Sequence, residues 1–140
     1  DVLVVNNNIY IASERGLFEQ HIGSDLYTLI SDKKFKNIRL YDNYIYANNQ
    51  DLWKIDMTNL QSENIKKNVL NFSISGDLVW INHIDHCKLL NINTNNSWTF
   101  NDRNGISSSA IYSVESDESR VWFMTDNGIA IYNWDMSDYE

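Results

Sequence analysis

The densest group of potential metal ligands in the sequence lies in one short stretch. His83, Asp85, His86 and Cys87 fall within five consecutive residues. Zinc favours His, Cys and Asp donors, and a hairpin turn can bring two of them together. Only His21 stands apart from this stretch as a further histidine, without a second ligand pair beside it. A polar hairpin tip therefore explains the stretch better than a metal centre, and we expect neither a metal nor a cofactor.

The acidic residues Glu115, Asp117 and Glu118 suggest a second kind of chemistry, because paired carboxylates can hydrolyse glycosides. These three residues lie beside a turn, where acids usually cap the backbone or face solvent. The stretch from Ser116 to Trp122 is near the S-x-D-x-G-x-T-W turn of sialidase-type propellers, but it lacks the Gly and the Thr. The sequence also contains no G-x-S-x-G elbow, phosphate loop or H-E-x-x-H motif. We therefore expect no catalytic residues.

The charge of the chain argues against nucleic acid as a partner. The formal net charge is −8, whereas phosphate binding needs clustered Lys and Arg. The densest basic cluster is Lys33, Lys34 and Lys36, and the next is Lys66 and Lys67. Both are predicted to be solvated turns.

The hydrophobic content indicates a folded domain, and its distribution offers no segment that could span a membrane. Hydrophobic residues make up 43% of the chain, which excludes a disordered protein. The longest apolar runs, such as Val2 to Val5, are far too short to cross a bilayer. The single Cys87 cannot form an internal disulfide.

A repeat organises the whole sequence. In four segments an aliphatic residue precedes an aromatic one, and the aromatics Tyr10, Tyr46, Trp80 and Trp122 are 36, 34 and 42 residues apart. Each segment follows a turn-forming stretch and is flanked by a strand on either side. A fourth strand follows where the chain has room for it. Residues 60–67 fit this fourth strand poorly, and the last repeat ends before one.

Four short strands in about 34 to 42 residues, repeated with aromatic punctuation, are typical of β-propeller blades. Helical repeats would show apolar residues at i, i+3, i+4 and i+7, which these segments do not. We predict an all-β chain of four-stranded antiparallel blades, about three full and a partial fourth. The blades span approximately 1–31, 35–67, 69–101 and 109–140. The four repeat aromatics are expected to fill the gaps between adjacent blades.

The fourth repeat carries a family resemblance. Asn104-Gly105-Ile106-Ser107-Ser108-Ser109-Ala110-Ile111-Tyr112-Ser113-Val114 is followed by Val121-Trp122-Phe123-Met124-Thr125-Asp126-Asn127-Gly128-Ile129. This resembles the two-component regulator propeller repeat, with its N-G-L-x-S-N-x-V-x-x-I, L-W-I-G-T and x-x-G-L segments. Ile106 and Ile129 replace Leu, Met124 replaces Gly and Ser109 replaces Asn. In the first repeat, the stretch from Ser13 to Phe18 is similar to the hairpin turn of that pattern.

The resemblance implies a place in a larger protein. Such repeats are typical of the extracytoplasmic sensor regions of bacterial hybrid two-component receptors, many of them tied to carbohydrate use. It therefore implies a periplasmic or extracytoplasmic, non-catalytic segment that senses an oligosaccharide, in a parent protein that carries a histidine kinase. A protein-interaction scaffold is the alternative, and a propeller lyase or glycosidase comes third.

The residues that would bind a ligand remain unknown from the sequence. Sugar sites often stack a ring on an aromatic face beside polar donors, but ordinary packing within a blade explains any one of these aromatics better. Seven aromatics outside the repeated position are candidates for such a site: Tyr27, Tyr41, Tyr44, Trp98, Tyr112, Trp134 and Tyr139. Blades of about 37 residues do not close a ring in this length. We expect either the remaining blades of a parent protein or a second copy of the chain to cover the open blade faces.

Overall fold

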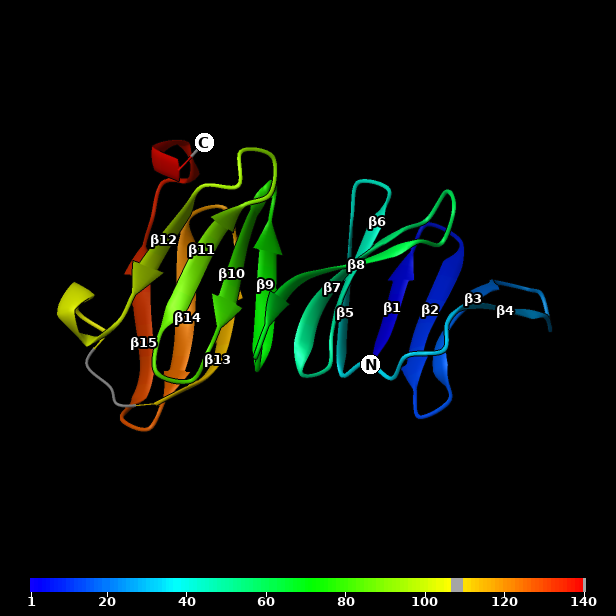
Figure 1. Cartoon of the computed structure of the whole chain (residues 1–140), viewed down its shortest axis with the longest axis horizontal. Coiled ribbons are helices and arrows are strands. Elements are labelled where there is room, and N and C mark those ends of the chain that lie inside the picture. Colours follow the sequence, from blue (N-terminus) through cyan, green and yellow to red (C-terminus); the bar gives the residue numbers. More distant parts are fainter. Residues whose placement is uncertain (107–109, 140) are drawn as a thin grey trace. The chain divides into compact units, whose positions relative to one another are not determined.

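The computed structural model describes residues 1–106 and 110–139; Ser107, Ser108 and Ser109 of the repeat motif and Glu140 lie outside the described residues. The chain divides into two compact units. We call Asp1–Lys67 unit 1 and Asn68–Glu140 unit 2. Each unit contains two antiparallel sheets, which are labelled strand by strand in Figure 1.

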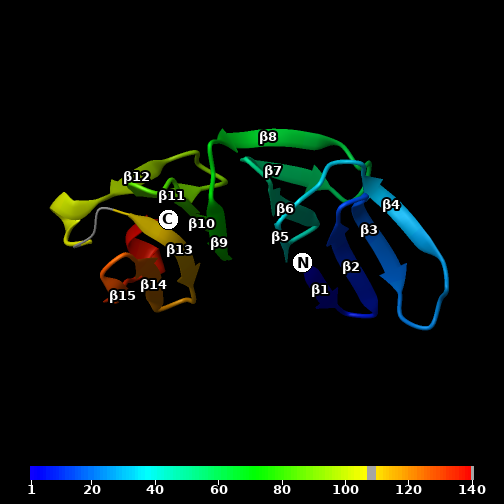
Figure 2. The same cartoon turned by 90° about the horizontal axis from the view of Figure 1, so that it is seen from below.

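Unit 1 contains two four-stranded sheets, blade 1 and blade 2, whose strands pair in chain order (Figure 2). The strands of blade 1 are β1 (Val2–Val5), β2 (Asn8–Ser13), β3 (Gly16–His21) and β4 (Tyr27–Ser31). The strands of blade 2 are β5 (Asn37–Tyr41), β6 (Tyr44–Asn48), β7 (Asp51–Asp56) and β8 (Ser62–Lys67). The stretch 60–67, which fits an outer strand poorly in the sequence, does contain the outer strand β8 over Ser62–Lys67.

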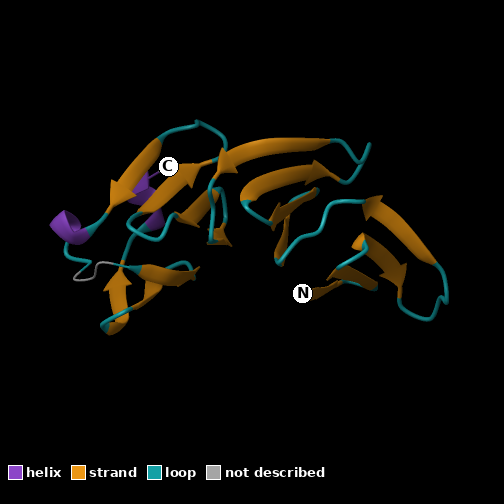
Figure 3. Ribbon diagram, turned by 60° about the horizontal axis from the view of Figure 1, so that its bottom comes forward, coloured by secondary structure: helices purple, strands orange, loops and turns teal. Residues whose placement is uncertain are grey.

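Unit 2 contains a four-stranded blade 3 and a three-stranded blade 4. The strands of blade 3 are β9 (Asn71–Ser75), β10 (Leu78–Asn82), β11 (Cys87–Asn91) and β12 (Ser97–Phe100). The strands of blade 4 are β13 (Ile111–Ser116), β14 (Arg120–Thr125) and β15 (Gly128–Asn133). The short 3-10 helices η1 (Asp102–Asn104) and η2 (Met136–Tyr139) also belong to unit 2, as Figure 3 shows. The prediction of antiparallel propeller blades, three full and one partial, is confirmed.

Turn chemistry explains why the first two strands of each blade form a hairpin. Asn6, Asp42 and Gly76 occupy the same turn in blades 1, 2 and 3, with φ of 53°, 54° and 56°. Asn, Asp and Gly tolerate this left-handed conformation better than other residues. Blade 4 uses another device, because the Asp117 carboxylate accepts hydrogen bonds from the turn amides of Ser119 and Arg120. Asn and Asp thus form the turns of a sequence that contains no proline.

Each unit has a core between its two blades. The core of unit 1 is mainly aliphatic, with Leu17, Ile38, Ile45 and Ile55 fully buried. The core of unit 2 combines aliphatic residues with a group of aromatic rings around Trp80. Both cores lie where side chains from facing sheets interdigitate, as in other packed sheets.

The four repeat aromatics occupy the third position of the second strand in each blade, on β2, β6, β10 and β14. Tyr10 and Trp80 belong to the cores of their units. In blade 2, Ile45 and Ala47 face the core, so Tyr46 projects from the opposite face.

Trp122 differs from the expectation that it fills a gap between blades. Its neighbours Val121 and Phe123 belong to the core of unit 2, whereas Trp122 is half-exposed. Successive side chains of a strand alternate between the faces of the sheet. Trp122 therefore projects from the face of blade 4 that is turned away from blade 3.

Candidate functional site

An open cleft in unit 1 collects several polar side chains around an indole ring. Its volume is about 600 Å³. Three segments form it: the β2–β3 turn, the β4–β5 connection, and the β6–β7 turn with the start of β7. The lining residues are Glu14, Lys33, Lys34, Phe35, Lys36, Asn49, Gln50, Asp51 and Trp53.

The Trp53 ring is fixed by packing against the core of unit 1 and by a hydrogen bond to Asn49. It lies on β7 and is partly buried against the core of unit 1. Its Nε1 donates a hydrogen bond to Oδ1 of Asn49, 3.3 Å away. The same Asn49 oxygen accepts the backbone N–H groups of Gln50 at 2.7 Å and Asp51 at 3.0 Å. This shared acceptor fixes the turn and the ring together, so the cleft has a preformed aromatic wall.

Charged groups surround this wall. Lys33 Nζ lies 4.9 Å from the centroid of the Trp53 ring, within the range of a cation–π contact. Lys34 pairs with Glu14 at 3.0 Å, but both side chains are largely exposed, and such pairs contribute little stability. Three lysines and two acids line the cleft, which gives it a formal charge of +1 in a chain of −8. The lysine cluster predicted to be a solvated turn is thus also one rim of the cleft.

The histidine stretch forms the β10–β11 hairpin of blade 3. The rings of His83 and His86 stack with centroids 4.7 Å apart. A 2.6 Å hydrogen bond with His86 lowers the pKa of Asp85. Cys87 points into the core, and burial raises the pKa of its thiol to about 12. Among the described residues, no three His, Cys, Asp or Glu side chains come together as a metal site would require.

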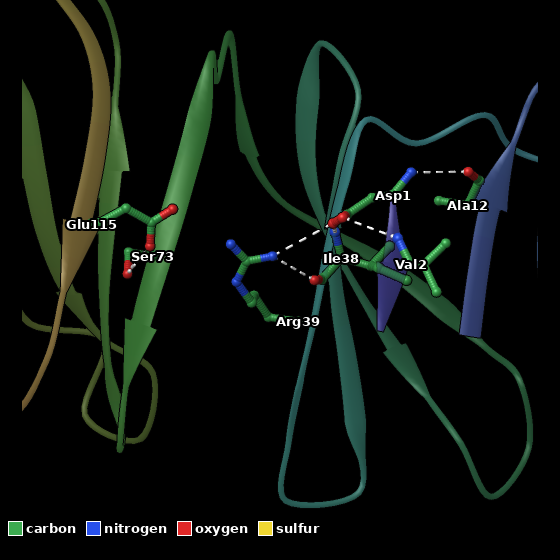
Figure 4. Close-up of polar contacts among 7 residues, drawn as sticks. All are labelled: Asp1, Val2, Ala12, Ile38, Arg39, Ser73 and Glu115. Carbon is green, nitrogen blue, oxygen red and sulfur yellow. Dashed lines mark hydrogen bonds and ion pairs between the residues drawn. The ribbon is translucent and has the colours of Figure 1, made fainter. Parts of the chain in front are cut away.

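The acidic stretch is divided between a strand and a turn. Asp117 accepts the backbone N–H groups of Ser119 at 2.8 Å and Arg120 at 2.7 Å. These bonds, with that of Ser119 foremost, lower the pKa of the carboxyl. Glu115 lies on β13 and accepts a hydrogen bond from Ser73 Oγ at 3.3 Å (Figure 4). Glu118 is exposed in the turn. Asp117 therefore acts as a turn cap.

The seven candidate aromatics divide into separate groups. Tyr44 lines a smaller cavity of about 280 Å³ in unit 1, with Lys54 Nζ 3.9 Å from its ring centroid. Trp98 and Trp134 both contact Tyr139 in unit 2. Tyr27 and Tyr112 are exposed, and Tyr41 is half-buried. Trp53 was not among the candidates because a Trp inside a strand is typical of ordinary blade packing.

The helices of the described residues are the two single turns η1 and η2, neither of which could cross a membrane. No protein-family model and no curated protein matches the sequence.

Solved structures do resemble the chain. The extracellular domain of the putative hybrid two-component system BT4673 from B. thetaiotaomicron superposes with a TM-score of 0.71 at 17% identity, over 94% of this chain and 19% of that one. The N-terminal domain of Nup159 gives 0.69 at 10% identity, over 92% and 38%. The computationally designed Ika4 protein gives 0.69 at 12% identity, over 94% and 88%. These likenesses show the fold alone, and the chain spans less than half of the two natural proteins.

Proposed function

We propose that this chain is a ligand-sensing, non-catalytic segment of a bacterial two-component receptor, located in its periplasmic or extracytoplasmic part. Three observations support this assignment. The blades share their fold with the extracellular domain of a hybrid two-component system. The fourth repeat resembles the two-component regulator propeller repeat. Unit 1 also carries an open cleft suited to a soluble ligand.

The ligand that we propose is an oligosaccharide, and the observation that carries the proposal is the placement of Trp53. Its ring is fixed by Asn49 and borders a cleft of about 600 Å³, which falls within the usual size of a ligand site. An indole face can stack on the apolar face of a sugar ring. Gln50, Asp51 and Lys36 line the same cleft and supply hydrogen-bond partners for hydroxyl groups.

The charge of the cleft favours acidic sugars. Lys33, Lys34 and Lys36 outnumber the two lining acids. Lys ammonium groups can form charge-assisted hydrogen bonds with uronate or sulfate groups. An oligosaccharide that carries such groups gains these contacts in addition to ring stacking.

Isothermal titration calorimetry of the 140-residue chain with acidic and neutral oligosaccharides of matched length tests this proposal. We expect oligogalacturonides or sulfated oligosaccharides to bind and the neutral cello- and malto-oligosaccharides to bind more weakly. Lys33→Gln should weaken binding of the acidic series about fivefold or more, since a hydrogen bond to a charged group contributes about 1.5–3 kcal/mol. Trp53→Phe retains an aromatic ring but loses the bond to Asn49, and it should weaken both series.

Lys88→Gln provides the matched control, because Lys88 lies on β11 of unit 2, outside the cleft. Its affinity should equal that of the unchanged protein. If both sugar series fail to bind, or if the Lys33 and Lys88 variants behave alike, the cleft is not the site. Release of a shortened sugar during the titration would instead favour the glycosidase or lyase alternative.

A protein-interaction scaffold is the second candidate, and a specific surface favours it. Met124, Ile129 and Ile131 are 53%, 68% and 59% exposed on blade 4. Strand pairing places Trp122 opposite Ile131 and Met124 opposite Ile129, so these residues share one sheet face. Exposed apolar patches of this kind are typical of interaction sites.

The partner that best fits this face is a further propeller blade. Trp80, at the equivalent position of blade 3, belongs to the core shared with blade 4, so Trp122 presents the same kind of face to a following blade. That blade comes either from the rest of a larger propeller or from a second copy of the chain. Light scattering distinguishes the two sources: association of the isolated chain indicates a second copy. A monomer whose face is covered only in a longer protein indicates the rest of the propeller. A monomeric longer protein with Trp122 still exposed would contradict both.

A further inference from the structure

Unit 2 contains a second cavity, whose walls are aromatic. Its volume is about 130 Å³. No acidic or basic side chain is among its described lining residues, and the polar ones besides the aromatics are Asn104 and Asn133. The six aromatic lining residues are Trp80, Phe100, Phe123, Tyr132, Trp134 and Tyr139.

The rings stand at steep angles around Trp80. Its ring centroid lies 5.0 Å from that of Phe100, 5.6 Å from that of Phe123 and 5.4 Å from that of Trp134. The interplanar angles are 49°, 82° and 68°. Since neighbouring rings are not parallel, their faces point in several directions, as the walls of a box do.

The polar edges of these rings are engaged or shielded. Trp134 Nε1 donates to the carbonyl oxygen of Asp117 at 3.0 Å, and the Tyr132 hydroxyl donates to the carbonyl oxygen of Gly105. Trp80 Nε1 is shielded from solvent and has no acceptor among the described residues. The indole faces, rather than the indole N–H groups, are therefore left to meet an occupant of the cavity.

The net charge of unit 2 favours a positively charged ligand in this cavity. Residues 68–140 contain ten acidic and three basic residues, a formal charge of −7, whereas residues 1–67 contain nine and eight, a charge of −1. Nearly all of the negative charge of the chain thus belongs to the unit with the aromatic cavity. Such a field raises the local concentration of cations.

We propose that this cavity binds a small organic cation, a trimethylammonium or similarly alkylated ammonium group. The negative faces of aromatic rings attract ammonium groups, and cages of such rings recognise quaternary ammonium ligands. An apolar cavity of about 150 Å³ accommodates one benzene molecule, so a cavity of about 130 Å³ matches one compact ammonium group. This site is separate from the unit 1 cleft and does not depend on it.

The test titrates the 140-residue chain with choline and with 3,3-dimethyl-1-butanol, its uncharged isostere, at constant ionic strength. The ¹H–¹⁵N signals of the five tryptophan indoles report binding. We expect choline to shift the Trp134 indole signal and to bind at least fivefold more tightly than the neutral isostere, because only the charged ligand gains cation–π contacts with several ring faces. Trp53 in unit 1 serves as an internal reference that should not shift.

Variants locate the site. Trp134→Leu removes one wall and should weaken choline binding at least fivefold. Tyr112→Phe changes an exposed tyrosine of β13 in the same unit, outside the cavity lining, and should bind choline as the unchanged protein does. Near-UV circular dichroism confirms that each variant is folded. Equal affinity for choline and the neutral isostere would overturn the proposal, since apolar fit alone would then explain binding. Shifts that persist in Trp134→Leu, or no indole shift in the unchanged protein, would overturn it as well.

Discussion

The two units solve the same structural problem with different chemistry. In both, the first strand of one blade lies beside the first strand of the next, β1 beside β5 and β9 beside β13. In unit 1 a carboxylate joins these two strands. Asp1 Oδ2 accepts the Ile38 N–H at 2.9 Å and lies 3.4 Å from Nη1 of Arg39 (Figure 4).

In unit 2 hydroxyl and amide groups make the corresponding junction. Ser73 Oγ accepts the Ser116 N–H at 2.9 Å, Asn71 Nδ2 donates to Ser113 Oγ at 2.7 Å, and Ser75 and Ser116 exchange a hydrogen bond at 2.9 Å. The repeat therefore specifies which strands meet, but not the chemistry of their junction. The same rule holds for the repeat aromatics, whose shared position does not give a shared environment.

The largest expected effect compares two tryptophans at one repeat position. Trp80→Ala should lower the free energy of unfolding by about 3–5 kcal/mol, because it leaves a cavity within the aromatic core. Trp122→Ala should cost about 1 kcal/mol, since Trp122 is half-exposed and outside that core. Urea denaturation of both variants measures the difference. Equal losses would show that another surface covers Trp122 and that blade 4 is not the open side of unit 2.

Much of the fold could be predicted because each blade repeats local signals. Turn residues such as Asn6 and Asp42 recur in the blades, each followed after four residues by an aromatic at the third position of the next strand. The face on which a repeat aromatic finds a neighbour could not be predicted, since it depends on which blade packs there. The outer strand β8 is also hard to predict from the sequence. It is held by backbone pairing with β7, and none of its side chains is fully buried, so it lacks the apolar pattern of the inner strands.

The candidate cleft could not be predicted from the sequence for a related reason. Glu14, Lys33 and Gln50 come from three separate connections of unit 1 and meet only when blades 1 and 2 pack together. The strand around Trp53 predicts a core residue, and the Trp53 side chain is indeed partly buried against the core of unit 1. The tail from Trp134 to Tyr139, a poor candidate for an outer strand, instead packs its rings against the core of unit 2.

A second comparison concerns the glycine that begins the third strand of blades 1 and 4. The two hairpins share local bonds, with Ser13 Oγ donating to Gly16 O and Thr125 Oγ1 to Gly128 O. Both glycines have positive φ, 126° and 108°. A Cβ at Gly16 would collide with the carbonyl oxygen of Ser31 on β4, whereas nothing lies within 4 Å of a Cβ at Gly128. Blade 4 has no fourth strand in the described residues.

Gly16→Ala should therefore destabilise by about 3 kcal/mol or more, since backbone must move in addition to the conformational strain. Gly128→Ala should cost about 1–2 kcal/mol, the strain alone. Thermal unfolding of the two variants measures the gap between them. A Gly128→Ala loss as large as that of Gly16→Ala would indicate that a strand does lie against β15.

The junctions between first strands offer a smaller comparison. Asp1→Ala and Ser73→Ala each remove the acceptor of a backbone N–H, that of Ile38 or of Ser116, and each should cost about 1–3 kcal/mol. Added salt should reduce the loss caused by Asp1→Ala, because ions screen the contact with Arg39, and should leave that of Ser73→Ala unchanged. Asp1→Asn retains an acceptor oxygen and is the control. Denaturation at two salt concentrations provides the measurement, and an equal salt response of the two alanine variants would contradict the comparison.

The smallest expected effect is a pH dependence that belongs to unit 2. The pKa values of Asp85, Asp117 and Asp135 are lowered by hydrogen bonds from His86, from the Ser119 backbone N–H and from the Ser137 hydroxyl respectively. A carboxyl whose pKa is lower in the folded chain binds more protons when unfolded, so it stabilises the fold above its unfolded value of 3.8. This contribution is lost as the pH falls below 3.8 and through the folded pKa.

Asp117→Asn isolates that contribution, because Asn keeps one acceptor oxygen for the turn but does not titrate. The variant should melt at a lower temperature than the unchanged protein at neutral pH. The difference should shrink as the pH falls through the acidic range, where Asp117 itself becomes protonated. Repulsion among the other acids of unit 2 acts on both proteins and largely cancels in the difference. Melting temperatures that differ by the same amount at pH 7 and at about pH 3 would show that the turn needs only the oxygen acceptor and not its charge.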